Sequence, residues 1–358
     1  NGVVAYAPSS TIYDPNLKPQ NTKSVEAGID LGFLNNRINV EFDWYKRNNY
    51  DLIGRIYTEG VGGVSSKYAN VAEMASHGVE FTVSTKNIEG ARPEDFSWST
   101  DFTFSYSKTE ITDLLAQTRV IDLVGIGGYA RVGYDHRSLF SIPFKGLNEE
   151  GLPTFLDQDG NITSTGIYFQ ESDKDKLGFL KYSGSVDPTE TGSLGNIFKY
   201  KNLTLNLFIT YSFGNVVRLD PVFKNEYNDL NSMPKEFANR WMVPGDEKKT
   251  TIPVIASSRQ NKNDSDLSYA YNAFNYSTER VAKGDFIRMK EISLGYDFPK
   301  KLTTAMKVNN LSVKLQATNL FLLYADKKLN GQDPEFFNTG GVAVPMPKQF
   351  TFTLKVGL

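Results

Sequence analysis

Residues 24–45 read SVEAGIDLGFLNNRINVEFDWY, a stretch that decides the fold class. Apolar residues take every second position of its first half, at Val25, Ala27, Ile29, Leu31 and Phe33. The second half repeats the alternation, through Ile38, Val40, Phe42 and Trp44. Asn35 and Asn36 lie between the halves, and asparagine tolerates the positive φ of a tight hairpin. A period of two on both sides of a two-residue turn predicts a β-hairpin with one apolar face.

The same alternation recurs to the end of the chain, whereas helical periodicity is almost absent. We predict nine strands of about 9 to 14 residues, the length that crosses a bilayer at a tilt. The alternating residues that mark these strands lie within about 24–34, 38–45, 79–85, 97–106, 193–200, 205–211, 292–298, 311–317 and 350–358.

Short and long connections alternate along this pattern. The short ones are expected at 35–36, 86–95, 201–202 and 299–309, and the long ones at 51–75, 108–190, 214–284 and 321–349. Short turns at one end and long loops at the other are typical of an outer-membrane barrel, with the loops extracellular. The fold class is therefore all-β, a transmembrane antiparallel β-barrel in the bacterial outer membrane. An odd strand count that begins outside indicates that earlier strands are missing from the chain.

The alternation also assigns the two faces. Val40, Phe42, Leu207, Leu294 and Leu354 are expected to face lipid, and Glu41, Thr210, Ser293 and Thr353 the lumen. Aromatic residues near strand ends are expected to form the two interfacial girdles, namely Trp44, Trp98, Tyr106, Tyr211, Phe298 and Phe350. Charged lumenal positions mix both signs and predict no charge preference for the cargo: Asp30, Glu41, Asp43, Asp101, Lys314 and Lys355.

Composition excludes several classes of function. The chain of 358 residues has no cysteine and only two histidines, His77 and His136, so thiolate metal sites and histidine-based catalysis are not expected. A net charge of −2 gives no reason to expect nucleic acid. Asp157, Asp159 and Asn161 lack the spacing of a calcium loop and predict a solvated turn. The glycine runs near 60–63 and 125–128 predict flexible loops. No catalytic residue, cofactor or metal is expected.

Several motifs resemble the SusC/RagA family of TonB-linked outer-membrane transporters. They are DPNLKP at 14–19, LGFLNNRI at 31–38, GLPTFLDQDGN at 151–161, LGNIFKYKNLTLNLFITYSFGN at 194–215, DFIRMKEISLGYDFPKKL at 285–302 and ATNLFLLY at 317–324. They follow the family's order over most of the chain, although Pro19 and Gln20 replace an aromatic and an acidic residue. The resemblance implies that residues 1–358 are the C-terminal part of a barrel of about 22 strands, with the plug domain and N-terminal strands outside this chain.

The resemblance also implies partners and a function. The parent protein would import oligosaccharide or oligopeptide, energised by the TonB complex and covered by a SusD-like surface lipoprotein. Exposed loop aromatics can stack on cargo, and the candidates are Tyr269, Tyr271, Phe274 and Tyr276. Packing within the loop or against the lipoprotein is the alternative for this run.

Other functions remain open at this stage: an outer-membrane barrel enzyme, a passive porin, or a soluble β-rich carbohydrate-binding module. The scarcity of histidine opposes the enzyme, and the asymmetry of the loops opposes the soluble module. The last strand, FTFTLKVGL at 350–358, keeps its apolar phase to Leu358. We expect it both to close the barrel and to dock on the assembly machinery by strand addition.

Overall fold

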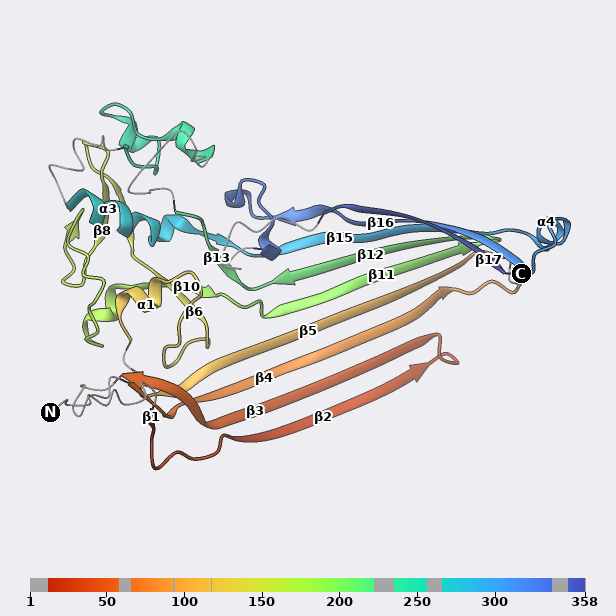
Figure 1. The fold of residues 1–358 in the computed structure, drawn as a ribbon, viewed down its shortest axis with the longest axis horizontal. Coiled ribbons are helices and arrows are strands. Elements are labelled where there is room, and N and C mark those ends of the chain that lie inside the picture. The colour runs from red at the N-terminus through yellow and green to blue at the C-terminus, as the bar shows by residue number, and fades with distance from the viewer. Residues whose placement is uncertain are drawn as a thin grey trace, which may run out of the picture.

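The computed structural model describes residues 12–57, 66–92, 94–116, 118–221, 235–255, 266–336 and 347–357. Its main feature is one curved antiparallel sheet with its strands side by side in chain order (Figure 1). Within the described ranges the order is β17-β16-β15-β12-β11-β5-β4-β3-β2, and the short β1 pairs with β4 in parallel. The sheet does not close on itself, so β2 and β17 each have a neighbour on one side only.

All nine predicted strands are present and in the predicted order, which confirms the all-β class. Their bounds are β2 Asn21–Phe33, β3 Ile38–Tyr57, β4 Ser66–Ile88, β5 Ser97–Leu114, β11 Glu190–Tyr200, β12 Leu203–Phe213, β15 Phe286–Asp297, β16 Asn310–Ala325 and β17 Gln349–Gly357. The strand β1 covers Ile12–Tyr13.

Several strands run further than predicted. β3 has 20 residues and β4 has 23, so most of the loop expected at 51–75 is strand, and its connection at 58–65 lies outside the described residues. β5 also continues to Leu114 and β16 to Ala325. These extensions pass beyond the length that a bilayer covers, and both faces of a strand can be polar in water. Without an apolar face, the period-two signal disappears although the hydrogen-bonded ladder continues.

The turns at one end of the sheet are short, and the connections at the other end are long (Figure 1). Asn35 and Asn36 adopt φ values of 55° and 61°, as predicted for the first hairpin, and Lys201 adopts 54° in the third. The short connection expected at 299–309 contains a helix, α4 Lys300–Ala305. Among the helices that the structure describes, none has the length and apolar character needed to cross a membrane.

The pairing register separates the two faces as the alternation predicts. One continuous row of paired residues is apolar and runs Leu31, Val40, Val83, Phe102, Leu194, Ile209. The adjacent row on the opposite face is polar and runs Asp30, Glu41, Thr82, Thr103, Ser193, Thr210. Below, the apolar face is called the outward face and the polar face the inward face. Every lipid-facing and lumen-facing residue named above lies on the face expected for it.

Aromatic rings are placed along the outward face near both ends of the apolar band. At the end with short turns, Trp98 stacks on Phe198 with ring centroids 5.7 Å apart. Nearer the loops, Trp44 and Tyr106 are both paired with Val79. These two lie inside β3 and β5 rather than near a strand end, because those strands continue past the apolar band. Contact of these rings with a lipid interface stays a prediction.

The long connections fold into a separate layer at the loop end of the sheet (Figure 1). Its helices are α1 Val120–Val124 and α3 Asp266–Asn275, with 3-10 turns at Lys176–Phe179, Lys235–Asn239, Asp246–Lys248, Thr278–Arg280, Lys327–Leu329 and Pro334–Phe336. Its short strands are β6 Ser138–Ser141, β7 Phe144–Leu147, β8 Pro153–Leu156, β9 Ile162–Thr163, β10 Lys181–Ser185, β13 Val216–Arg218 and β14 Val281–Lys283. As predicted, the body of the 108–190 segment after β5 lies outside the membrane-crossing sheet.

The main hydrophobic core of the described residues lies in this loop layer and not in the sheet. Phe140, Ile142, Phe155 and Phe274 are at most 1 % exposed there. On β17, by contrast, Phe350 is 76 % exposed. An open sheet of one layer offers both faces to its surroundings, so the large apolar side chains that are fully buried lie mainly in the loops.

The first prediction concerns the two faces. Spin labels at Val40, Phe42, Leu207, Leu294 or Leu354 should be relaxed by a lipid-soluble agent, because those positions share the outward face. Labels at Glu41, Thr210, Ser293 or Thr353 should respond to a water-soluble agent instead. Exchange of the two responses on two or more strands would contradict the register.

The second prediction concerns β17, whose apolar residues all lie on one exposed face. Replacing Phe352 and Leu354 by Asp, or deleting residues 356–358, should block membrane insertion, since a charged side chain on the lipid face destabilises the inserted barrel. Leu358 itself lies outside the described residues. Heat-modifiable migration and surface labelling of the full-length protein provide the measurement. Normal insertion with selective loss of uptake would instead give the last strand a lumenal function.

Candidate functional site at the inward face and the extracellular loops

The inward face carries unpaired carboxylates over β2, β3 and β4. Asp30 is directly opposite Glu41, and Asp43 is directly opposite Glu80 in the adjacent row. Among the described residues no lysine, arginine or histidine lies within 4.0 Å of any of the four. Arg47 and Glu26 form an ion pair on the same face of β2 and β3, nearer the loops. Like charges directly opposite one another destabilise a sheet. These carboxylates therefore make this part of the inward face electronegative, at some cost to stability.

The sign of the inward face changes toward β16 and β17. Lys314 and Lys355 are on this face, and Lys314 Nζ lies 3.6 Å from Glu291 Oε1. Gln316 donates to the other oxygen of Glu291 at 3.0 Å. The six charged lumenal residues predicted from the sequence are therefore separated by sign. The four carboxylates lie on β2, β3 and β5, and the two lysines lie on β16 and β17.

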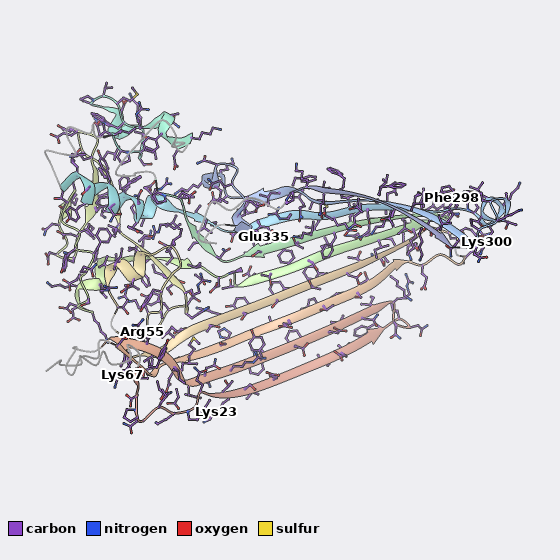
Figure 2. The ribbon with its side chains drawn as sticks, in the orientation of Figure 1. Lys23, Arg55, Lys67, Phe298, Lys300 and Glu335 are labelled. Atoms are coloured by element: carbon purple, nitrogen blue, oxygen red, sulfur yellow. The ribbon has the colours of Figure 1, made fainter. Side chains whose placement is uncertain are left out.

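The segment after β16 folds against the inward face. Arg288 of β15 is directly opposite Thr210 and is 4 % exposed. Its guanidinium forms an ion pair with Asp333, and Arg288 Nε lies 3.1 Å from Glu335 Oε2. Figure 2 labels Glu335 beside the loop end of β15. This contact could not be predicted from the sequence, because a complete strand separates the acidic pair from Arg288 and the pair has the pattern of a solvated loop.

The four aromatic candidates of the 269–276 run do not share one surface. α3 directs Tyr271 and Phe274 into the loop core, where they are 6 % and 0 % exposed, and Tyr276 packs against the same core. Tyr269 is 55 % exposed. Ligand contact stays a prediction for all four, and the exposed ring is the one that cargo can reach in this conformation. A helix was not predicted here, although Leu267, Ala270, Tyr271 and Phe274 have helical spacing.

Arg218 fastens three loop segments together. Its guanidinium donates to the carbonyls of Phe140 and Ser277 at 2.7 and 3.0 Å, and to Ser141 Oγ at 3.1 Å. Burial lowers the pKa of Arg218 to about 9, so the side chain stays a cation at neutral pH. The cation also lies over the ring of Tyr276. These bonds join the 115–189 connection to both ends of the 214–285 connection.

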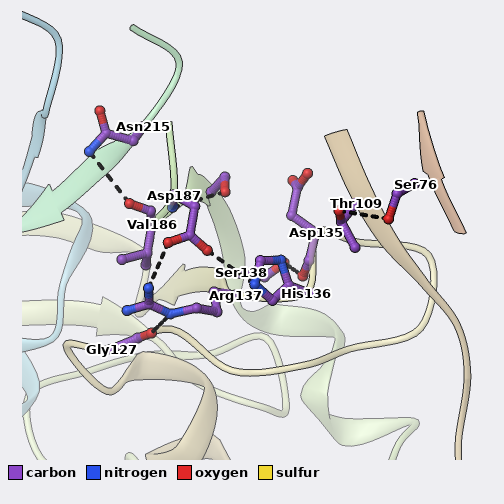
Figure 3. Close-up of polar contacts among 11 residues, drawn as sticks. Ser76, Thr109, Gly127, Asp135, His136, Arg137, Ser138, Val186, Asp187 and Asn215 are labelled. Atoms are coloured by element: carbon purple, nitrogen blue, oxygen red, sulfur yellow. Dashed lines mark hydrogen bonds and ion pairs between the residues drawn. The ribbon is translucent and has the colours of Figure 1, made fainter. Parts of the chain in front are cut away.

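A small cavity of about 90 Å³ lies where β5 meets the loop layer. His136 Nε2 lies 3.2 Å from Asp187 Oδ2, and Arg137 donates to Oδ1 of the same carboxylate at 2.6 Å (Figure 3). Ser185 lines the same cavity, but its Oγ accepts from the backbone N–H of Asp187 at 3.2 Å. The described contacts therefore tie two loop segments together and do not include the serine-to-histidine bond of a hydrolase.

Two further motifs have structural explanations. Asp157 Oδ1 accepts from the backbone N–H groups of Asp159 and Asn161 at 2.9 and 2.8 Å, which confirms the predicted turn. Gly128 adopts a φ of 66° in a turn after α1. The glycines at 60, 62 and 63 lie outside the described residues. The described residues contain no group of three or more His, Asp or Glu side chains arranged to hold a metal ion.

A comparison with known protein families gives a result that agrees with the sheet, its two faces and its loops. The family model described as "TonB dependent receptor-like, beta-barrel" matches residues 2–311. The chain belongs to this TonB-dependent receptor family. It is accordingly an outer-membrane β-barrel chain, and the location predicted from the sequence is confirmed.

Relatives of this receptor chain support the resemblance to the SusC/RagA family. It is 25 % identical to TonB-dependent receptor P3 of Formosa agariphila over 94 % of its own length and 32 % of the relative's. It is 26 % identical to TonB-dependent receptor SusC of Bacteroides thetaiotaomicron, over 97 % of its own length and 32 % of the relative's. A solved structure titled "Structure of the RagAB peptide transporter" matches in fold, with a TM-score of 0.73 and 22 % identity, over 96 % of this chain and 36 % of that one.

The receptor chain thus spans about a third of the length of the curated relatives that it matches. These relatives are named as receptors and not as enzymes, which agrees with a non-enzymatic chain. The resemblance stated from the motifs is confirmed at the level of family, fold and location. The substrate and the partners of the whole protein are left to proposals.

The third prediction separates packing from contact in α3 of this receptor. Phe274→Ala should destabilise the loop layer by about 3–5 kcal/mol, because the ring is fully buried. Tyr269→Ala is the matched control on the same helix, and its exposed ring should change stability by about 0.5 kcal/mol or less. Hydrogen exchange across residues 266–276 of the folded receptor measures both. Equal loss of protection in the two variants would contradict the packing described here.

Proposed function

We propose that the protein containing this chain actively imports oligomeric nutrients, glycan or peptide, across the outer membrane with energy from TonB. The observation that carries the proposal is the register of the main sheet. One polar face continues from β2 to β17, and one apolar face continues opposite it. A wall that is wet on one side and apolar on the other suits a channel through lipid.

Residues 1–358 are proposed to be the C-terminal part of a larger barrel, with the plug domain and N-terminal strands in the rest of the protein. Two observations support this. The chain covers about a third of its relatives. The sheet is open, and an unpaired strand edge cannot remain in hydrocarbon, so β2 and β17 need further strands. The family membership supports energy from TonB.

The loop layer is proposed to receive the cargo and a SusD-like lipoprotein lid. It lies at the extracellular end of the sheet and exposes apolar side chains, among them Met242 at 62 %, Val243 at 57 % and Tyr168 at 58 %. Contiguous exposed apolar surface marks contact sites, and Met242 and Val243 are adjacent in the chain. Tyr269 is the proposed stacking residue for cargo, since its ring is exposed while its neighbours on α3 are held in the core.

The fourth prediction tests energy coupling in the full-length protein. Uptake should stop when the upstream TonB-binding segment is deleted or when the proton-motive force is collapsed, because a plugged barrel conducts nothing on its own. Surface labelling of the deletion variant is the control for normal insertion. Tyr269→Ala, measured in the same assay, should weaken uptake without abolishing it.

Two other experimental outcomes would each support a different function for the protein. Persistent uptake without the proton-motive force would indicate a passive porin. Hydrolysis of a supplied glycan or peptide by the purified protein would indicate a barrel enzyme, with the cavity at His136 and Asp187 as its first candidate site. The hydrogen bonds of that cavity favour the structural role.

A further inference from the structure

The outward face changes chemistry abruptly toward the loops. Trp44, Val79 and Tyr106 are paired across β3, β4 and β5 and form the last apolar row. One step further along the same face, Lys46 is paired with His77, and His77 with Lys108. Below, these three residues are called the basic row. Lys23 is diagonal to Lys46 on β2, and Figure 2 places it at the loop end of that strand.

The basic row lies at the height of the outer membrane interface. The segment of β5 from Trp98 to Lys108 is about 33 Å long along the strand. With a strand tilt of about 40°, this length corresponds to roughly 25 Å along the membrane normal. That depth equals the apolar band of an outer-membrane barrel. The basic row is thus at the level of lipid headgroups, and Lys46 and Lys108 are about 10 Å apart across two strand spacings.

The basic row makes no ion pair in the part of the chain that the structure describes. Lys46 and His77 are exposed and Lys108 is half-buried, and none of the three lies within 4.0 Å of a described carboxylate. Glu110 and Glu190 share the outward face, two positions along β5 and at the start of β11. Both border Lys108, and Glu110, opposite Ala75, is also diagonal to His77. Lys108 further lines the cavity that contains Asp187. Lys46 and Lys23, by contrast, have no acidic neighbour on the outward face of β2 and β3.

We propose that the basic row binds a phosphate group of an outer-leaflet lipid. Phosphate is the anion that a headgroup presents at this depth, and lysine is a common partner for it. Long cationic side chains at the edge of an apolar surface keep their stems on that surface and their charges in the headgroup layer. An acidic protein segment is the weaker choice, because the row borders the lipid-facing surface directly. The assignment depends on the outer-membrane location and not on transport.

The experiment uses the full-length protein purified in mild detergent and native mass spectrometry. The probes are a doubly phosphorylated outer-leaflet glycolipid, the same lipid with its phosphates removed, and inorganic phosphate. We expect the phosphorylated lipid to bind wild type most tightly. The variant Lys46→Gln with Lys108→Gln should bind it roughly 10- to 30-fold more weakly, with no change for the dephosphorylated lipid.

The matched control is Lys314→Gln with Lys355→Gln, which removes the same charge from the inward face and should leave lipid binding unchanged. Equal binding by wild type and the basic-row variant would overturn the proposal. So would equal binding of the two lipids, or displacement of the lipid by millimolar inorganic phosphate, which would indicate a site for the free anion. Heat-modifiable migration verifies folding, and the single variants Lys46→Gln and His77→Gln replace the double variant if it does not insert.

Discussion

Backbone hydrogen bonding in hydrocarbon is the constraint on which the rest of this structure depends. Lipid offers no donor or acceptor, so each N–H and C=O of a crossing strand must bond to a neighbouring strand. A meander of next-neighbour strands meets this requirement with the shortest connections, and the order from β2 to β17 follows the chain without exception. The same requirement makes the outer edges of β2 and β17 incomplete without further strands.

A sheet that separates lipid from water has no buried interior of its own. Its outward side chains are matched to lipid and its inward ones to water, so tight packing is left to the connections. Phe140, Phe155 and Phe274 accordingly form a core in the loop layer, and Arg218 joins its segments through carbonyl groups. The loops thereby gain a fixed shape, which a surface that recognises cargo or a partner requires.

Alternation in the sequence predicted every strand of the main sheet because lipid on one face and water on the other leave a period of two. It could not predict the ends of β3 and β4, where both faces are wet and residues such as Asn48 and Asn49 are hydrogen-bonded in the ladder without an apolar neighbour pattern. It also missed α3, although Leu267, Ala270, Tyr271 and Phe274 have helical spacing, since four residues in a long loop are a weak signal. The contact of Arg288 with Asp333 is non-local and leaves no periodicity at all.

Charge on each face follows from the same difference between lipid and water. On the inward face, repulsion between Asp30 and Glu41, which are directly opposite, destabilises the sheet, but water screens the two charges and keeps this destabilisation small. On the outward face a charge within the apolar band would cost about 2–4 kcal/mol, so the band between Trp98 and Tyr106 contains none on β5. The first outward charges therefore mark where the hydrocarbon ends. Lys46 and Lys108 lie one step beyond the aromatic row on β3 and β5, where an anionic headgroup layer favours cations, and Glu190 of β11, paired with Tyr106, is a carboxylate at the level of that row.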